Sequence, residues 1–173
     1  MPKILAIDDK RDNLITLSAM LKAMMPGCEV ITATSGPEGI EKAKTDLPDT
    51  ILLDIKMPGM DGYEVCNRLK NIEYIKNIPV IMISAIRTGS EDLVKGLDTG
   101  ADAYLAKPID EYVLIAQVKT ALRIKQAEDN LRNRKDRLEQ IVQERTAALR
   151  QTNRQLQQEI DESRRIKEEK TKL

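Results

Sequence analysis

Short apolar runs alternate with helix-like patterns along the first 108 residues of the chain. Apolar runs bounded by turn residues are typical of strands buried on both faces. They predict five strands, at residues 3–8, 29–33, 50–54, 80–84 and 103–105. Apolar residues three or four positions apart predict an amphipathic helix after each of the first four strands. The four stripes are Leu14, Leu17, Leu21 and Met24; Ile40, Ala43 and Leu47; Val65, Leu69 and Ile72; and Leu93 with Leu97. This alternation predicts right-handed βαβ units and one parallel, doubly wound α/β sheet.

The pattern changes after Pro108. From 110 to 173 there is no Gly and no Pro, and good helix formers dominate. These residues predict one continuous helix from about 110 to beyond 160. Its beginning is apolar enough to pack on the sheet, through Tyr112, Val113, Ala116, Ala121 and Leu122.

Beyond Arg123 the apolar residues thin to a narrow seam. Its members are Leu131, Leu138, Val142, Leu149, Asn153, Leu156 and Ile160. Steps of three, four and seven are typical of a coiled coil. The step of eleven from Leu138 to Leu149 indicates a four-residue stutter. The predicted organisation is therefore a domain at 1–122 and a coiled-coil helix at 123–173, continuous with the last helix of the domain.

Charge and composition exclude several classes of protein. The chain carries 28 basic and 28 acidic residues, and its two parts differ only mildly, with net charges of −4 for 1–122 and +4 for 123–173. Such a balance does not by itself indicate a nucleic-acid binder. Two lone thiols, Cys28 and Cys66, suit a reducing cytosol. No signal-peptide pattern or membrane-length apolar run is present, so we expect a cytoplasmic protein without membrane insertion.

Four charged residues lie where predicted strands end. Asp8 and Asp9 close the first strand, Asp54 closes the third, and Lys107 follows the fifth. The carboxyl ends of parallel strands converge on one crevice, where ligands bind. Aspartates at strand ends also start loops or cap helices, but scattered caps would not converge in this way. Clustered carboxylates without His or thiolate suit Mg²⁺ or Mn²⁺, and an aspartate can accept a phosphoryl group as a nucleophile.

Further motifs accompany these residues in a fixed order. The segment 57–62 (MPGMDG) follows Asp54, Ser84 ends the fourth strand, and Tyr104 lies three residues before Lys107-Pro108. This ordered set closely resembles the receiver domain of bacterial two-component response regulators, over residues 3 to about 122. The resemblance implies a flavodoxin-like sheet with strand order 2-1-3-4-5.

The resemblance also implies roles for single residues. Asp54 matches the phosphoacceptor, and Lys107 and Ser84 match the residues that contact the phosphoryl group. Ser84 and Tyr104 match the pair that moves on activation. The bond between Lys107 and Pro108 is expected to be cis. The metal ligands implied are Asp8, Asp9, Asp54 and the backbone carbonyl of Lys56.

The expected function is a phosphorylation-dependent signalling switch. The chain has no His, so the phosphoryl group must come in trans, from a sensor histidine kinase or a phosphotransfer protein. We expect no enzymatic activity beyond Mg²⁺-dependent self-phosphorylation and dephosphorylation at Asp54. The tail around Glu144-Arg145-Thr146 looks like the coiled-coil linkers that join receivers to output modules. It predicts a homodimer that acts on a fused or separate output module.

Other functions compete with this one. The chain could be a coiled-coil adaptor whose phosphorylation is vestigial, although the complete site argues against that. The tail could also be a solvated helix without a fixed partner. A DNA-binding tail is a third possibility, because Arg132, Arg134, Lys135 and Arg137 cluster. Asp136 and Glu139 interleave with this cluster, however, and we therefore expect no direct nucleic-acid binding.

Overall fold

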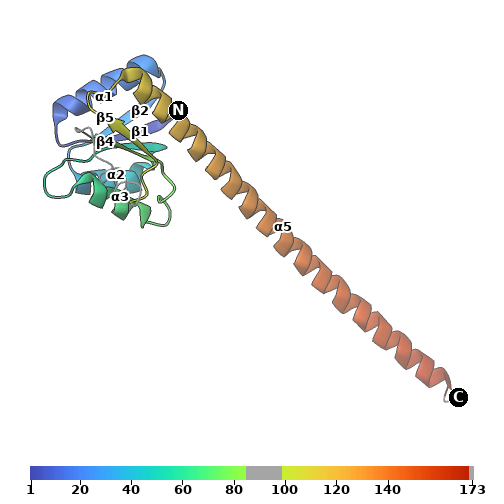
Figure 1. The fold of residues 1–173 in the computed structure, drawn as a ribbon. Helices are drawn as coiled ribbons and strands as arrows, with labels where there is room; N and C mark the ends of the chain where they lie inside the picture. The colour runs from blue at the N-terminus through green and yellow to red at the C-terminus, as the bar shows by residue number, and fades with distance from the viewer. Residues whose placement is uncertain (85–98, 172–173) are drawn as a thin grey trace. The chain divides into compact units, whose positions relative to one another are not determined.

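A computed structural model describes residues 1–84 and 99–171 (Figure 1). Five parallel strands form one sheet in the order β2-β1-β3-β4-β5. Their bounds are β1 Lys3–Ile7, β2 Glu29–Ala33, β3 Thr50–Asp54, β4 Val80–Ser84 and β5 Ala103–Ala106. The described helices are α1 Arg11–Met24, α2 Gly36–Asp46, α3 Gly62–Lys70 and α5 Glu111–Thr171. The predicted fold class and strand order are confirmed, while the helix expected around Leu93 and Leu97 lies outside the described residues.

Helices cover both faces of the sheet, with α1 on one side and α2 and α3 on the other (Figure 1). Successive side chains of a strand point to opposite faces, so each strand contributes to two cores. In β1, Leu5 and Ile7 join the core under α2 and α3, and Ile4 and Ala6 join the core under α1. The three inner strands are almost wholly buried, which explains their uninterrupted apolar sequences.

The long helix α5 begins on the α1 side of the sheet. Its buried residues there are Leu114, Ile115, Val118 and Ala121, spaced as one face of a helix. By packing, the chain divides into Met1–Glu128 and Asp129–Leu173. The predicted division at residue 122 remains a prediction. Within the described ranges, no helix combines the length and apolarity needed to span a membrane.

Three details of the predicted helices are wrong. Leu47 lies beyond the end of α2, with a left-handed φ of 48° and a side chain that is 54% exposed. Ile72 likewise lies just past α3, although it still packs against the core. At the start of α5, Tyr112 and Val113 are exposed, as is Ala116, because the neighbouring Leu114–Ile115 pair faces the sheet instead. In each case the helical spacing of an apolar residue near a helix end does not determine which face or element it joins.

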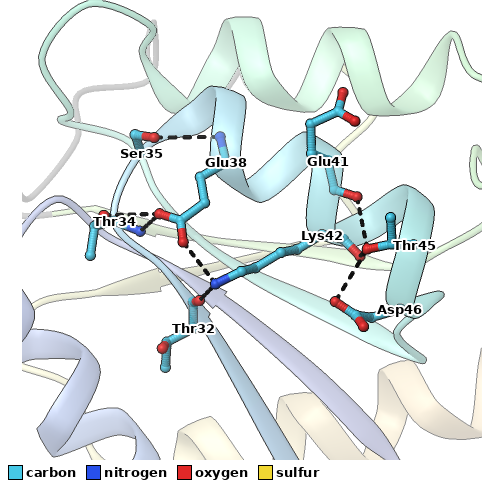
Figure 2. A network of polar contacts seen from close by, with 8 residues as sticks. All are labelled: Thr32, Thr34, Ser35, Glu38, Glu41, Lys42, Thr45 and Asp46. Carbon is cyan, nitrogen blue, oxygen red and sulfur yellow. Dashed lines mark hydrogen bonds and ion pairs between the residues drawn. The ribbon is translucent and has the colours of Figure 1, made fainter.

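The free edge of β2 is covered by two side chains of α2 (Figure 2). The carboxylate of Glu38 accepts hydrogen bonds from the backbone N–H of Thr34 at 2.7 Å and from its hydroxyl at 2.9 Å. Lys42 Nζ donates to the carbonyl of Thr32 at 2.6 Å and forms an ion pair with Glu38 at 2.7 Å. An edge strand otherwise presents unpaired backbone groups to other chains. Glu38 and Lys42 therefore satisfy the edge groups at Thr32 and Thr34.

This network leads to a prediction about acid stability. The hydrogen bond from Lys42, followed by those from Thr34, lowers the pKa of Glu38 from 4.5 to about 2. Because the pKa of Glu38 is lower in the folded than in the unfolded state, its carboxylate stabilises the fold at pH values above the unfolded pKa. This contribution is lost as the pH falls through about 2. We expect Glu38→Gln to cost about 0.5–1 kcal/mol near pH 7, a value kept small because both side chains are over a third exposed. The deficit should shrink steadily below pH 4.5 in urea unfolding.

Glu41→Gln is the matched control, because the exposed Glu41 lies on the same helix and its carboxylate pairs with the half-buried Lys44. Its effect should be smaller than that of Glu38→Gln. Equal effects of the two substitutions, or a deficit that does not depend on pH, would contradict a special role for the β2 edge network.

Candidate functional site

The predicted site residues come together at the carboxyl ends of the strands. Asp8 and Asp9 follow β1, Asp54 is the last residue of β3, and Lys107 follows β5. Because β1, β3 and β4 are adjacent and parallel, their ends meet at one edge of the sheet. Lys107 reaches this edge because its backbone N–H donates to the carbonyl of Ser84 at 2.6 Å.

One ammonium group bridges two of the carboxylates. Lys107 Nζ lies 2.7 Å from Asp54 Oδ1 and 3.1 Å from Asp8 Oδ2. Both carboxylates are nearly inaccessible, with Asp8 1% and Asp54 4% exposed. Charge-assisted hydrogen bonds in such a buried site are stronger and more directional than those at the surface. Lys107 therefore holds the two carboxylates together.

The sequence predictions did not include Asn13. Its side-chain amide donates to both oxygens of Asp8, at 3.0 Å and 2.8 Å, and the backbone N–H of Lys10 adds a third bond at 2.8 Å. Asn13 lies in the first turn of α1, where side chains point back toward the helix N-terminus. A polar residue one turn after the acidic pair was the signal that could have identified it.

Charge crowding controls the ionisation of this site. Burial raises the pKa of Asp54, the nearby Asp8 and Asp9 add to the rise, and Lys107 opposes it. For Lys107, burial alone would lower the pKa, but the bonds to Asp54 and Asp8 outweigh burial and raise it. Lys107 thus stays charged, and one positive charge faces three carboxylates.

The three carboxylates form a suitable cation site. One oxygen from each of Asp8, Asp9 and Asp54 lies within 4.8 Å of the others. Asp9 Oδ1 is buried without a hydrogen-bond partner among the described residues, so this oxygen is available to a ligand. The donors are all oxygens, as Mg²⁺ and Mn²⁺ prefer. These residues therefore fit a hard divalent cation.

Ser84 and Tyr104 lie on the neighbouring strands β4 and β5. Ser84 is buried at the end of β4, directly beside the end of β3. Tyr104 lies opposite Met82 in the β4–β5 register and packs against the core under α2 and α3. Burial raises the pKa of Tyr104 to about 12, so it remains a neutral phenol at physiological pH. Ser84 therefore lies beside the end of β3, whereas Tyr104 lies two residues before the end of β5, against the core.

The loop after Asp54 is held tightly against the site. Gly62, the first residue of α3, donates its N–H to the carbonyl of Ile55 at 2.9 Å. A Cβ atom at position 62 would collide with the backbone carbonyl of Asp54. Only glycine lets α3 begin this close to β3. The exposed Lys56 lies in the same loop, two residues beyond Asp54.

The bond between Lys107 and Pro108 is cis, as expected. Every site residue expected from the sequence thus lies within the described part of the chain. The structure brings Asp8, Asp9, Asp54 and Lys107 into one cluster.

Comparison with known proteins points to one family. The response regulator receiver domain model matches residues 4–119. The chain is 45% identical to the response regulator PleD of Caulobacter vibrioides over 132 residues, which cover 76% of this chain and 28% of PleD. It is 40% identical over 123 residues to RpaA of Synechocystis, a DNA-binding dual master transcriptional regulator, covering 71% of this chain and 50% of RpaA. The chain thus spans half or less of these two relatives.

The structural comparison agrees. The Vibrio cholerae chemotaxis protein CheY4 matches with a TM-score of 0.65 and 31% identity, covering 70% of this chain and 99% of CheY4. A putative response regulator from Chloroflexus aurantiacus matches with a TM-score of 0.64 and 33% identity, covering 71% of this chain and 99% of that one. The similarity is therefore concentrated in the α/β domain.

The crowded carboxylates lead to a prediction about stability. Asp54→Asn should stabilise the metal-free protein, because it removes one of three like charges at a buried site. We expect the melting temperature in EDTA to rise by about 2–5 °C, the shift that roughly 1 kcal/mol produces in a domain of this size. Added Mg²⁺ should raise the melting temperature of the wild type more than that of the variant. Glu73→Gln, which removes an exposed carboxylate, is the control. A lower melting temperature for Asp54→Asn in EDTA would contradict the crowding argument.

Proposed function

Because the chain belongs to the response regulator receiver domain family, we propose that it is a signalling switch that accepts a phosphoryl group on Asp54. The observation that carries this proposal is the pair of short contacts from Lys107 to Asp54 and Asp8 at the carboxyl end of the sheet. A carboxylate is a ready nucleophile once ionised, and it needs no general base.

The reaction transfers a phosphoryl group from a phosphohistidine or a small phosphodonor. A carboxylate oxygen of Asp54 forms a bond to phosphorus while the donor's bond to phosphorus breaks. From phosphohistidine the leaving imidazole nitrogen takes up a proton from solvent, whereas a carboxylate such as acetate leaves a small donor as the anion. Catalysis of such transfers rests on positioning and on neutralising the charge of the phosphoryl oxygens. Lys107 supplies one positive charge, and the hydroxyl of Ser84 offers a hydrogen bond to a phosphoryl oxygen.

Asp8, Asp9 and Asp54 would hold the divalent cation, Mg²⁺ or Mn²⁺, with the backbone carbonyl of Lys56. The bound cation would supply the remaining neutralisation of the phosphoryl oxygens. Asn13 fixes the carboxylate of Asp8 before the cation arrives. Ser84 and Tyr104 would respond to phosphorylation by moving toward the phosphoryl group and into the domain.

The 173 residues contain no His that could carry the donated phosphoryl group, so the group comes from outside this segment. We infer a sensor histidine kinase or a phosphotransfer protein in the cytoplasm. The signal would leave through the helical segment 129–173, paired with a second copy of the chain, to a fused or separate output module. The exposed Leu138 and Leu149 on this segment support pairing, because single helices seldom leave a continuous apolar seam in water.

Labelling with a small phosphodonor such as acetyl phosphate tests the acceptor. Asp54→Asn should abolish acid-stable, hydroxylamine-labile labelling, and Asp9→Ala should reduce it severely by weakening cation binding. Circular dichroism should show that both variants stay folded. Undiminished labelling of Asp54→Asn would exclude Asp54 as the acceptor.

Truncation tests the tail. A chain that ends at Glu128 keeps the whole packed domain and should be labelled at the wild-type rate. Sedimentation should find it monomeric, whereas the full chain should be dimeric. A truncated chain that dimerises as tightly as the full chain would place the dimer contact in the receiver domain.

A further inference from the structure

One side of the helical segment 129–167 carries an exposed apolar stripe. Its residues are between 50% and 74% exposed in the single chain, and they are Leu131, Leu138, Val142, Leu149, Leu156 and Ile160. The exposed Ile166 lies about 100° away from this stripe around the helix. A stripe this long on a helix of one chain fits a second helix.

Two coiled-coil registers agree up to Val142, with Leu131, Lys135 and Leu138 in the core of both, and they differ beyond Val142. Ile160 is a core residue only with a stutter, and Ile166 only in the unbroken heptad. An unbroken heptad repeat from Leu131 places Arg145, Thr152 and Glu159 in the core. A four-residue stutter after Val142 shifts the core by one residue. The core then receives Thr146, Asn153 and Ile160 in their place. Leu149 and Leu156 are core residues in both registers.

Charge decides between the two registers. In a parallel pair, the unbroken heptad would set Arg145 against Arg145 and Glu159 against Glu159 in the core. A buried like-charge pair has a desolvation cost and a repulsion that nothing compensates. The stutter moves both charges to flanking positions and leaves only neutral side chains between Val142 and Ser163. One Asn at a core position is a known means of fixing register and partner number.

We propose that a second copy of this chain pairs with the segment 131–163 in parallel and in register, with the stutter between Val142 and Thr146. This inference rests on the dimeric tail of the proposed function and specifies its geometry. Parallel pairing in register places Asn153 against Asn153, where two amides can bond to each other.

The flanking charges are mostly complementary in this arrangement. Arg134 faces Glu139 of the second copy, and Glu159 faces Arg164 of the second copy, as in the interhelical pairs of other coiled coils. Within one chain, Glu139 has only a loose 3.7 Å contact with Lys135, and both side chains are well exposed, so Glu139 is free to exchange partners. A like-charged pair, Arg145 with Arg150, flanks the stutter, where the supercoil is locally unwound.

A matched cysteine scan of the full chain tests this register. Three variants place a thiol in the stutter core: Thr146→Cys, Asn153→Cys and Ile160→Cys. Three neighbours serve as controls, because they are core positions only in the unbroken heptad: Arg145→Cys, Thr152→Cys and Glu159→Cys. The first set should form interchain disulfides about tenfold faster than the second, because thiols that point apart cannot bond without backbone movement. The wild type should form none, since Cys28 and Cys66 are buried.

Faster cross-linking of the control set would establish the unbroken heptad and overturn the register. A protein that is dimeric by sedimentation but cross-links at neither set would overturn parallel pairing. A monomeric full chain would overturn the dimeric tail itself. Phosphorylation of Asp54 is measured separately in each variant, so loss of the register leaves the acceptor assignment intact.

Discussion

The meeting of three carboxylates and one ammonium group at the end of a parallel sheet is the constraint on which this domain depends. Asp8 and Asp54 are buried, and Lys107 bonds to both. A single positive charge cannot compensate three negative ones in a water-poor site. The carboxylate cluster therefore carries excess negative charge. A bound cation, or the loss of the negative charge of Asp54, would reduce this excess.

The surrounding structure serves to keep these groups in place. The amide of Asn13 fixes Asp8, and the close approach of Gly62 fixes the loop after Asp54. The N–H of Lys107 is bonded to the carbonyl of Ser84, so the lysine and the hydroxyl residue belong to one rigid edge. A preorganised site of this kind needs little rearrangement when charge develops on a phosphoryl group. The same hydrogen bond joins the end of β5 to the end of β4, beside Asp54 at the end of β3.

The sequence predicts most of this fold because the signals are strong and redundant. Apolar runs in β1, β3 and β4 are long and bounded by turns, and their parallel pairing then places Asp8 and Asp54 at one edge. Lys107 reaches the same edge through the shorter β5, which pairs with β4. Asn13 could not be predicted in the same way, because its role depends on the angle at which α1 leaves β1. Leu47 fits the helical spacing equally well, and only the left-handed turn at its own position removes it from α2. Local pattern thus determines which elements form, but the ends of elements depend on tertiary contacts.

The helical tail differs from the domain in what its sequence can determine. Continuous helical composition is enough to predict α5, which runs to Thr171. The sequence does not determine in the same way how α5 pairs with a partner, because the packing of an apolar seam depends on both helices. The unbroken heptad places Arg145 and Glu159 in the core, and the stutter register places Thr146 and Ile160 there instead. Leu149 and Leu156 are core residues in both. A signal passes along a helix only if the helix has two arrangements of similar free energy that the distant site can bias. In the proposed dimer, the stutter register is the more stable arrangement, and the cost of placing Arg145 and Glu159 in the core sets how far the unbroken heptad lies above it in free energy.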